Sequence, residues 1–347
     1  MTINDINEYF NENNLRYPEI LLFSKGDRLG SENYTLSEPK SHNLIDKQKL
    51  WNHFELGYTI KIENAHLAFL QIENLCKNLG KSLKANLRAN MYITPPNSHA
   101  FNPHYDLHDV IVLQLHGTKK WKLYDLAYEK PIDGQILTKG QLAHYKDIEP
   151  TKLHTINTGE IIYIPRGYVH DAYTESEMSV HITLGVYPKI KLNILKDIVQ
   201  NGDKNITLRG SITTDYSKES LKNELMNSLS ELIDDYFSQN PFIENYPNRL
   251  DFKNRFITFE KSNSICEHTT IYINHNDYIG IYKCVDSRIE VRTGAKSIYF
   301  PNFVESTLHS IFNEKSLKID KIEGGLNFES RKNLVQRLLK EGLLYLK

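Results

Sequence analysis

Two short motifs in this chain carry side chains of the types that bind metal ions. His104 and Asp106 lie in the run Asn102-Pro-His-Tyr-Asp-Leu-His-Asp, and His170 ends the run Ile164-Pro-Arg-Gly-Tyr-Val-His. On a strand, a spacing of two directs the side chains of His104 and Asp106 to the same face. Two imidazoles and one carboxylate form the facial triad of non-haem Fe(II) oxygenases. The motifs therefore predict an iron site formed by His104, Asp106 and His170.

The ordinary alternative is that these histidines are core or surface residues with no ligand role. Their sequence context favours the metal site. Pro103 suits the start of a strand because it lacks a backbone donor, and Pro165 and Gly167 indicate a tight turn just before His170. The other histidines, His108 among them, follow no matching pattern.

A facial triad leaves three coordination positions, which suit the keto-acid end of 2-oxoglutarate and O2. The distal carboxylate of 2-oxoglutarate then needs a cation. Lys119 shares one strand face with Trp121 and Leu123, so it points inward if they do. An inward lysine requires an anion. The alternative is that Lys119, Lys120 and Lys122 are all solvated.

Two further strands combine a polar face with an apolar face. The polar residues are Asn90, Tyr92 and Thr94 on one strand, and Ser179, His181 and Thr183 on the other. Such a face suits the wall of a cavity that holds a polar co-substrate, or residues that orient a metal ligand. It equally suits a half-exposed edge in contact with water.

The elements that must position these residues are short strands. Between residues 85 and 188, segments rich in β-branched and aromatic residues alternate with turn signals, which predicts an antiparallel sandwich or barrel. The expected strands are Leu87–Thr94, Val110–Leu115, Trp121–Tyr124, Ile161–Ile164, His170–Tyr173 and Ser179–Val186. Before them we expect helices at 3–12, at 46–54 with Asp46 as N-cap, and at 64–79 between Asn64 and Gly80.

After Pro188 the pattern becomes helical, with helices expected at 190–199 and 217–237. Leucines repeat along the second helix as a stripe, which is either a packing face within the chain or a dimer interface. Pro241 and Pro247 mark a boundary. Strands within 254–300, helices at 303–312 and 330–341 and a strand at 343–346 then predict a small α+β module of winged-helix type.

Composition indicates a globular protein with an ordinary charge balance. The chain has 347 residues, 40% of them hydrophobic and 24% charged, and its net charge is −1. We therefore expect no nucleic-acid partner and no membrane attachment. The three cysteines form no close pair, and the N-terminal residues have no signal-peptide pattern, so we expect a cytoplasmic protein.

Several of these runs resemble a known family when they are read together. The resemblance lies in Asn90-Met-Tyr-Ile-Thr-Pro-Pro, in the stretch from Ala100 to Trp121, in Gly159 to Ala172, and in Ser179-Val-His-Ile-Thr. It covers roughly residues 15–190. These motifs resemble the JmjC-type cupin oxygenases of the ribosomal oxygenase group, although Glu160 stands where aspartate is more usual.

The resemblance implies a mainly β fold with a double-stranded β-helix core and flanking helices. It implies Fe(II) on His104, Asp106 and His170, with 2-oxoglutarate held at its far end by Lys119 and contacted by Asn90, Tyr92 and Thr183. The implied domains are a JmjC/cupin catalytic domain at 1–189, a helical dimerisation region at 190–247 and a winged-helix-like domain at 248–347. The implied substrate is a histidine or arginine of a ribosomal protein.

Two other functions remain open at this point. The same oxygenase chemistry could act on a peptide natural product, a small molecule or a modified tRNA base. A non-enzymatic cupin could bind a partner through the helical region and the C-terminal module. Binding of Fe(II) and 2-oxoglutarate would distinguish the enzyme from the binding module.

Overall fold

The computed structural model describes residues 1–37, 43–135, 137–212, 217–239, 255–274, 279–284, 288–293 and 297–347. Contacts divide the chain into two units, Met1–Tyr187 and Pro188–Lys347, and each is described by itself. In the described residues, no helix is long and apolar enough to cross a membrane. The predicted domain boundary at 247/248, together with Pro241 and Pro247, lies outside the described residues.

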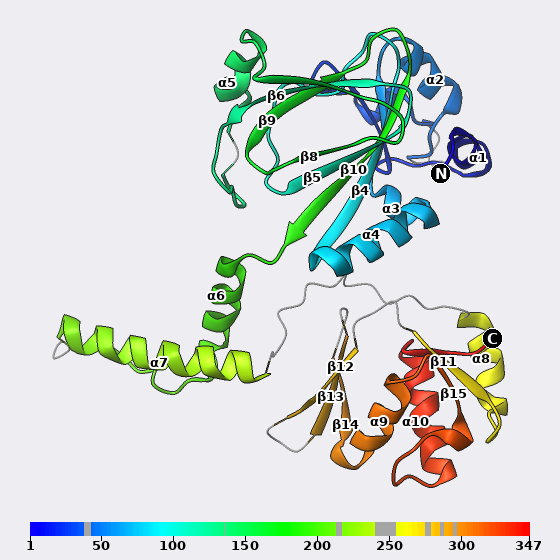
Figure 1. Cartoon of the computed structure of the whole chain (residues 1–347), viewed down its shortest axis with the longest axis vertical. Helices are drawn as coiled ribbons and strands as arrows, with labels where there is room; N and C mark the ends of the chain where they lie inside the picture. Colours follow the sequence, from blue (N-terminus) through cyan, green and yellow to red (C-terminus); the bar gives the residue numbers. More distant parts are fainter. Residues whose placement is uncertain are drawn as a thin grey trace. The chain divides into compact units, whose positions relative to one another are not determined.

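The first unit contains two antiparallel sheets (Figure 1). One sheet has seven strands in the order β2-β1-β3-β4-β10-β5-β8, and the other has three in the order β7-β6-β9. The strands are β1 Ile20–Ser24, β2 Asp27–Arg28, β3 Thr59–Ile62, β4 Ala85–Thr94, β5 Asp109–His116, β6 Lys119–Leu126, β7 Lys152–Ile156, β8 Ile161–Ile164, β9 Tyr168–Tyr173 and β10 Ser179–Pro188. All the strands predicted in this block are confirmed, and β7 is an additional one.

Four helices of the first unit pack against the seven-stranded sheet, namely α1 Ile3–Glu12, α2 Lys47–Glu55, α3 Ala65–Ala68 and α4 Leu70–Leu83. The short α5 Lys139–Leu142 instead packs beside β6 and β9 through Leu142. Asp46 caps α2, as predicted, by accepting a hydrogen bond from the Lys49 backbone N–H. The helix predicted over 64–79 is wrong in detail, because extended backbone at Phe69 separates α3 from α4, and α4 continues past Gly80.

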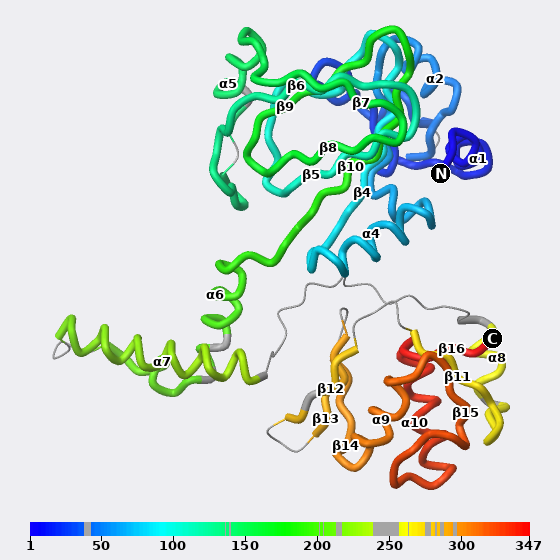
Figure 2. Tube along the Cα trace, in the orientation of Figure 1, coloured from blue at the N-terminus to red at the C-terminus, as the bar shows by residue number. Residues whose placement is uncertain are grey.

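The main core lies between these helices and one face of the sheet. Met91 on β4 and Ile182 on β10 are almost completely buried there, with Ile72 of α4 in the same cluster. Strands β4 and β10 are far apart in sequence but adjacent in the sheet, as the tube in Figure 2 shows. Because side chains alternate along a strand, the neighbours of these residues project from the opposite face of the sheet.

The second unit begins with the helices α6 Lys191–Gln200 and α7 Lys218–Gln239. Lys189 links them, because its ammonium pairs with Asp197 at 2.8 Å and donates to the Tyr236 hydroxyl at 3.2 Å. The predicted leucine stripe is divided, since Leu232 is buried whereas Leu225 is exposed. The choice between a packing face and a dimer interface therefore stays open.

The C-terminal part of this unit is α+β. Its elements are α8 Arg255–Lys261, β11 Thr270–Ile273, β12 Ile279–Lys283, β13 Arg288–Thr293, β14 Ser297–Pro301, α9 Glu305–Phe312, β15 Ser316–Lys318, α10 Phe328–Lys340 and β16 Leu344–Tyr345. Two three-stranded sheets, β15-β11-β16 and β12-β13-β14, share one apolar core with α9 and α10. Residues 255–261 were predicted within a run of strands but form a helix, in which buried Thr258 accepts a hydrogen bond from the Leu346 backbone. The winged-helix assignment stays a prediction.

Gly167 occupies the tight turn before β9 and has a left-handed φ of +87°. A β-carbon there would overlap the Tyr128 carbonyl, whereas Gly159, with φ +89°, has no neighbouring atom within 4 Å of that position. We therefore expect Gly167→Ala to lower the free energy of unfolding by about 1–3 kcal/mol more than Gly159→Ala, since only the first adds overpacking to backbone strain. Urea unfolding followed by circular dichroism measures the difference, and equal losses would contradict the turn geometry.

Candidate active site

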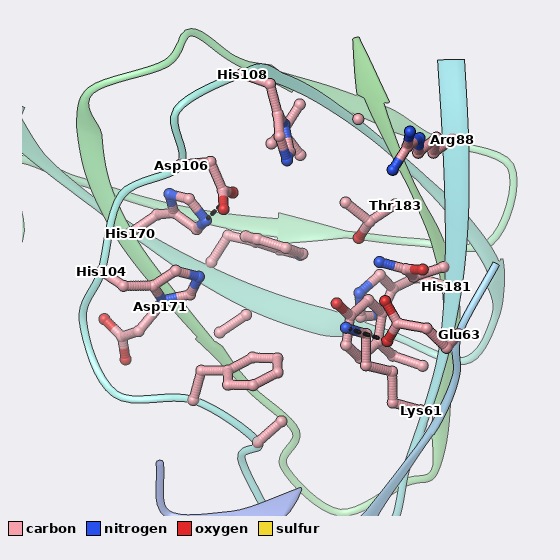
Figure 3. Close-up of a pocket in the computed structure, with 18 of the residues that line it drawn as sticks. Lys61, Glu63, Arg88, His104, Asp106, His108, His170, Asp171, His181 and Thr183 are labelled. Atoms are coloured by element: carbon pink, nitrogen blue, oxygen red, sulfur yellow. Dashed lines mark ion pairs between the residues drawn. The ribbon is translucent and has the colours of Figure 1, made fainter. Parts of the chain in front are cut away.

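Three side chains of metal-binding type meet in the first unit. One possible ligand atom from each of His104, Asp106 and His170 lies within 4.8 Å of the other two. His170 Nε2 is 3.6 Å from Asp106 Oδ2, and the two imidazole centroids are 4.6 Å apart. Figure 3 shows the three side chains converging on one side of a pocket. Sequence reasoning had predicted this set, and the structure brings all three together.

The backbone holds these residues through a bridge outside the regular strands. The His104 N–H donates to the His170 carbonyl at 3.1 Å, and the His170 N–H donates to the His104 carbonyl at 2.8 Å. The Asp106 carbonyl accepts a bond from Gly167 N–H at 3.1 Å. The expectation that His104 and Asp106 lie on a regular strand is therefore wrong, because only this bridge pairs the segment before β5. The bridge nevertheless keeps the two residues beside β9.

Hydrogen bonds to backbone carbonyls set the tautomers of both histidines. His104 Nδ1 lies 2.9 Å from the Asn102 carbonyl, and His170 Nδ1 lies 3.1 Å from the Tyr168 carbonyl. A carbonyl oxygen only accepts, so each Nδ1 carries the proton. Each Nε2 then presents a lone pair, which is the arrangement of a metal-ligating histidine.

The charges in this group suit a cation. Burial raises the pKa of the Asp106 carboxyl, but the imidazoles of His104, His170 and His108 outweigh it and hold that pKa below its ordinary value. Burial and the neighbouring His104 lower the pKa of His170 to about 4. A carboxylate beside neutral imidazoles is the protonation state in which all three residues can donate lone pairs to a metal ion.

The group opens into a cavity of about 480 Å³ between the two sheets. β4 and β10 supply much of its wall through the faces opposite the main core, and β6 of the other sheet adds Lys119 and Trp121. Residues predicted for the co-substrate lie on this wall, namely Asn90, Tyr92, Lys119 and Thr183. The structure thus gathers every predicted site residue around one space, while their individual roles stay predictions.

Lys119 is the buried cation of this cavity. Its side chain is only 3% exposed, and its ammonium donates to the Thr94 hydroxyl at 2.7 Å. Within the described residues it has no carboxylate partner. Burial alone therefore lowers the pKa of Lys119 from 10.5 to about 7. A buried ammonium of this kind is stabilised when an anion binds beside it.

Tyr92, His181 and Trp121 form an aromatic cluster near Lys119. The Tyr92 and His181 rings stack at 4.9 Å with an interplanar angle of 11°, and Trp121 meets His181 edge-on at 5.6 Å. Burial and the charge of Lys119 keep the pKa of His181 well below its ordinary value, so this ring is neutral. Asn90 is fixed differently, because its side-chain oxygen accepts a hydrogen bond from Asn64 N–H at 3.0 Å.

Sequence reasoning missed other polar residues of the cavity. They are Lys61, Glu63, Asn64, Arg88, His108, Asp171 and Tyr187. For two of them a signal was present. Lys61 alternates with apolar Ile60 and Ile62 on a short strand, and His108 continues the two-residue spacing of His104 and Asp106.

Comparison with known proteins gives a family match over part of the chain. A family model described as the JmjC domain matches residues 64–194. The predicted resemblance to JmjC proteins is confirmed over this part of the chain, and the oxygenase activity stays a proposal.

The similar proteins fall into two sets. In sequence, the chain is 35% identical over 139 residues to the bifunctional lysine-specific demethylase and histidyl-hydroxylase NO66 of Drosophila persimilis, covering 40% of this chain and 20% of that protein. The NO66 protein of Drosophila grimshawi is 36% identical over 142 residues, covering 40% of this chain and 19% of that protein. The chain thus spans about a fifth of the length of these relatives.

In structure, the chain is similar to the ribosomal oxygenase YcfD of Escherichia coli, with a TM-score of 0.55 at 12% identity, covering 100% of this chain and 91% of that one. A second YcfD structure, in complex with cobalt and succinic acid, gives a TM-score of 0.56 at 13% identity, covering 99% and 90%. At such identities the likeness concerns the fold, and it confirms the predicted mainly β cupin/JmjC class with flanking helices.

The pKa of Lys119 gives a prediction about stability. The unfolded chain holds the lysine proton up to a pKa of 10.5, whereas the folded chain releases it near 7. Without co-substrate, this residue should therefore make stability rise as pH increases between those values. Thermal melts of wild type and Lys119→Met from pH 7 to 10 test this, since the rise should be smaller in the variant.

Lys120→Met is the matched control, because Lys120 is ion-paired with Glu175 at 2.6 Å and its pKa is raised. A folded pKa above the ordinary value gives a stabilising contribution that is constant below 10.5 and is lost only at higher pH, so it adds no pH dependence between 7 and 10. Identical pH profiles of stability for Lys119→Met and wild type would show that folding does not lower the pKa of Lys119.

Proposed function

We propose that this protein is an Fe(II)- and 2-oxoglutarate-dependent oxygenase that hydroxylates a protein side chain, specifically a histidine or arginine of a ribosomal protein. One observation carries the proposal. A single cavity contains both a 2-His-1-carboxylate group and a buried lysine without a carboxylate partner among the described residues. The first matches the ligand set of Fe(II), and the second matches the distal carboxylate of 2-oxoglutarate.

When bound, Fe(II) with 2-oxoglutarate and O2 supplies oxidation of an unactivated C–H bond, with succinate and CO2 as by-products. The residues of the chain prepare the site for it. His104 and His170 would direct their Nε2 lone pairs at the metal, because their Nδ1 protons are held by carbonyls. Asp106 would add a negative charge, and Lys119 would bind the distal carboxylate of the co-substrate. Buried aromatic rings such as Trp121 exclude water from this end of the cavity.

The similar proteins support the substrate class. NO66 is named as a histidyl-hydroxylase, and YcfD is described as a ribosomal oxygenase in complexes with cobalt and succinic acid or 2-oxoglutarate. A protein side chain is thus the substrate that agrees with both. We further propose that residues 190–247 form a dimerisation region, supported by exposed apolar residues on α6 and α7 such as Leu195 and Met226.

The metal ligands provide the first test. His104→Ala should reduce succinate formation from 2-oxoglutarate to the background rate, because two protein ligands hold Fe(II) poorly at a site built for three. Succinate is measured by mass spectrometry after incubation with Fe(II), 2-oxoglutarate and O2. His116→Ala is the control, since His116 is exposed at the end of β5. Undiminished turnover in His104→Ala would exclude the ligand assignment.

Lys119 provides the second test. Lys119→Ala should weaken 2-oxoglutarate binding by roughly 10- to 100-fold, because it removes a charge-assisted hydrogen bond to the distal carboxylate. Anaerobic calorimetry of the Fe(II)-loaded protein measures the dissociation constant, with Lys120→Ala as the solvent-facing control. The proposed role fails if the affinity for 2-oxoglutarate is the same in Lys119→Ala as in wild type.

A further inference from the structure

Glu63 places a second carboxylate in the catalytic cavity. It follows directly after β3, and its side chain lines the cavity while remaining about one-third exposed, at 34%. Lys61, which lies on β3 and is only 14% exposed, pairs with the Oε2 atom of Glu63 at 2.6 Å. In the part of the chain that the structure describes, the other oxygen, Oε1, has no hydrogen-bond partner. The ion pair therefore holds Oε2 in place, while Oε1 can accept a hydrogen bond from a bound molecule.

The charge of Glu63 acts on the interior of the cavity. Burial, followed by the charges of Asp106 and Glu63, raises the pKa of Tyr92. Burial also raises the pKa of Tyr187, and the same two carboxylates contribute. Figure 3 shows Glu63 and Lys61 across the pocket from the three metal-type ligands. Glu63 and Asp106 thus act on the same two phenols from different sides of one space.

The proposed oxygenase chemistry leaves Glu63 without a task. Asp106 is assigned to the metal and Lys119 to the co-substrate. Asp171, the third carboxyl group of the cavity wall, is hydrogen-bonded with Tyr124. The Arg88 guanidinium lies over the Tyr187 ring at 5.7 Å from its centroid. Asp171 also has an oxygen, Oδ1, without a hydrogen-bond partner among the described residues, but Figure 3 shows its carboxylate pointing away from the pocket. Glu63 is thus a carboxylate on the pocket side that the proposed chemistry does not use.

Glu63 lines two neighbouring pockets. In the wall of the catalytic cavity, Gly185 lets His108 and Tyr187 pack closely, because a β-carbon there would lie 3.0 Å from both side chains. Glu63 and Asn64 line not only the catalytic cavity but also a second pocket of about 510 Å³ beside α1. Glu63 thus borders both the catalytic cavity and a space outside it.

We propose that Glu63 is the specificity-determining residue for the substrate, and that its Oε1 accepts a hydrogen bond from an N–H group of the side chain that is hydroxylated. Lys61 is a positioning residue that fixes the orientation of the carboxylate. An imidazole and a guanidinium both carry such N–H groups, whereas aliphatic side chains do not. This inference rests on the proposed function and adds to it the group that selects the acceptor.

The test uses the full chain and a library of synthetic peptides with histidine, arginine or leucine at the central position and randomised flanks. Mass spectrometry detects the addition of one oxygen atom, and the peptides that react are resynthesised for kinetics. Glu63→Gln should raise KM for those peptides by about tenfold, because it keeps the shape of the side chain but loses the charge-assisted bond. Lys61→Met should raise KM less, since the carboxylate remains.

Two further measurements separate this role from others. Glu19→Gln is the matched control, because Glu19 lines the second pocket but not the catalytic cavity. The KM of this variant for the peptides should equal that of wild type. Anaerobic calorimetry should give the same 2-oxoglutarate affinity for Glu63→Gln and wild type. Loss of that affinity in Glu63→Gln would overturn the inference by assigning Glu63 to the co-substrate.

The remaining outcomes are equally decisive. The inference is overturned if Glu63→Gln has the wild-type KM, if peptides with central leucine react as well as the others, or if the wild type binds 2-oxoglutarate but hydroxylates no peptide. Failure of the wild type to bind 2-oxoglutarate in the presence of Fe(II) is a different result. It would reject the proposed function itself, and this inference with it.

Discussion

The alternation of side chains along β4 and β10 is the constraint on which the first unit depends. Each strand serves two environments, because consecutive residues project from opposite faces of the sheet. Met91 and Ile182 belong to the apolar core, whereas Tyr92 and His181 line the cavity. A shift of one residue in the register of either strand would exchange these sets, exposing the core residues to the cavity and burying the polar residues under the helices. The pairing of β10 with both β4 and β5 therefore secures the core and the site together.

The cavity contains buried polar groups, which are unfavourable in a protein interior. Lys119, His181 and Trp121 are buried polar groups, and within the described residues His181 Nδ1 and Trp121 Nε1 have no hydrogen-bond partner. Leaving buried polar atoms unpaired costs free energy. The first unit can carry this cost because its helices and strands bury a large apolar cluster on the other face of the same sheet. The apolar core that stabilises the fold and the wall of the cavity therefore lie on opposite faces of the seven-stranded sheet.

Much of this was predictable from sequence because the signals are local. The period-two pattern located the strands around Asn90 and Thr183, and the motif spacing located His104, Asp106 and His170. Other features depend on contacts that no local pattern reports. The backbone pairing of His104 with His170 joins distant segments, so a regular strand was expected where only a bridge exists. Glu63 was missed because it follows its strand in a turn, where alternation no longer indicates which way a side chain points.

In the second unit, too, prediction from sequence succeeded where the local pattern is clear and failed where tertiary contacts decide. The elements α9 and α10 were expected close to their observed bounds, since their apolar periodicity is clear. Residues 255–261 were misassigned because a short run of aromatic and β-branched residues suits a strand as well as a helix. Tertiary contact decides such cases, here the hydrogen bond between Thr258 and the Leu346 backbone.

The bridge between His104 and His170 has a consequence for how the domain folds. Its two backbone hydrogen bonds join the segment before β5 to β9, so the three ligand-type side chains are brought together by contacts between segments far apart in the sequence. An ion held by these residues would bind the folded first unit and not the unfolded chain. Metal concentration would then enter the folding equilibrium directly. A bound ion would then stabilise the backbone pairing that joins the segment before β5 to β9.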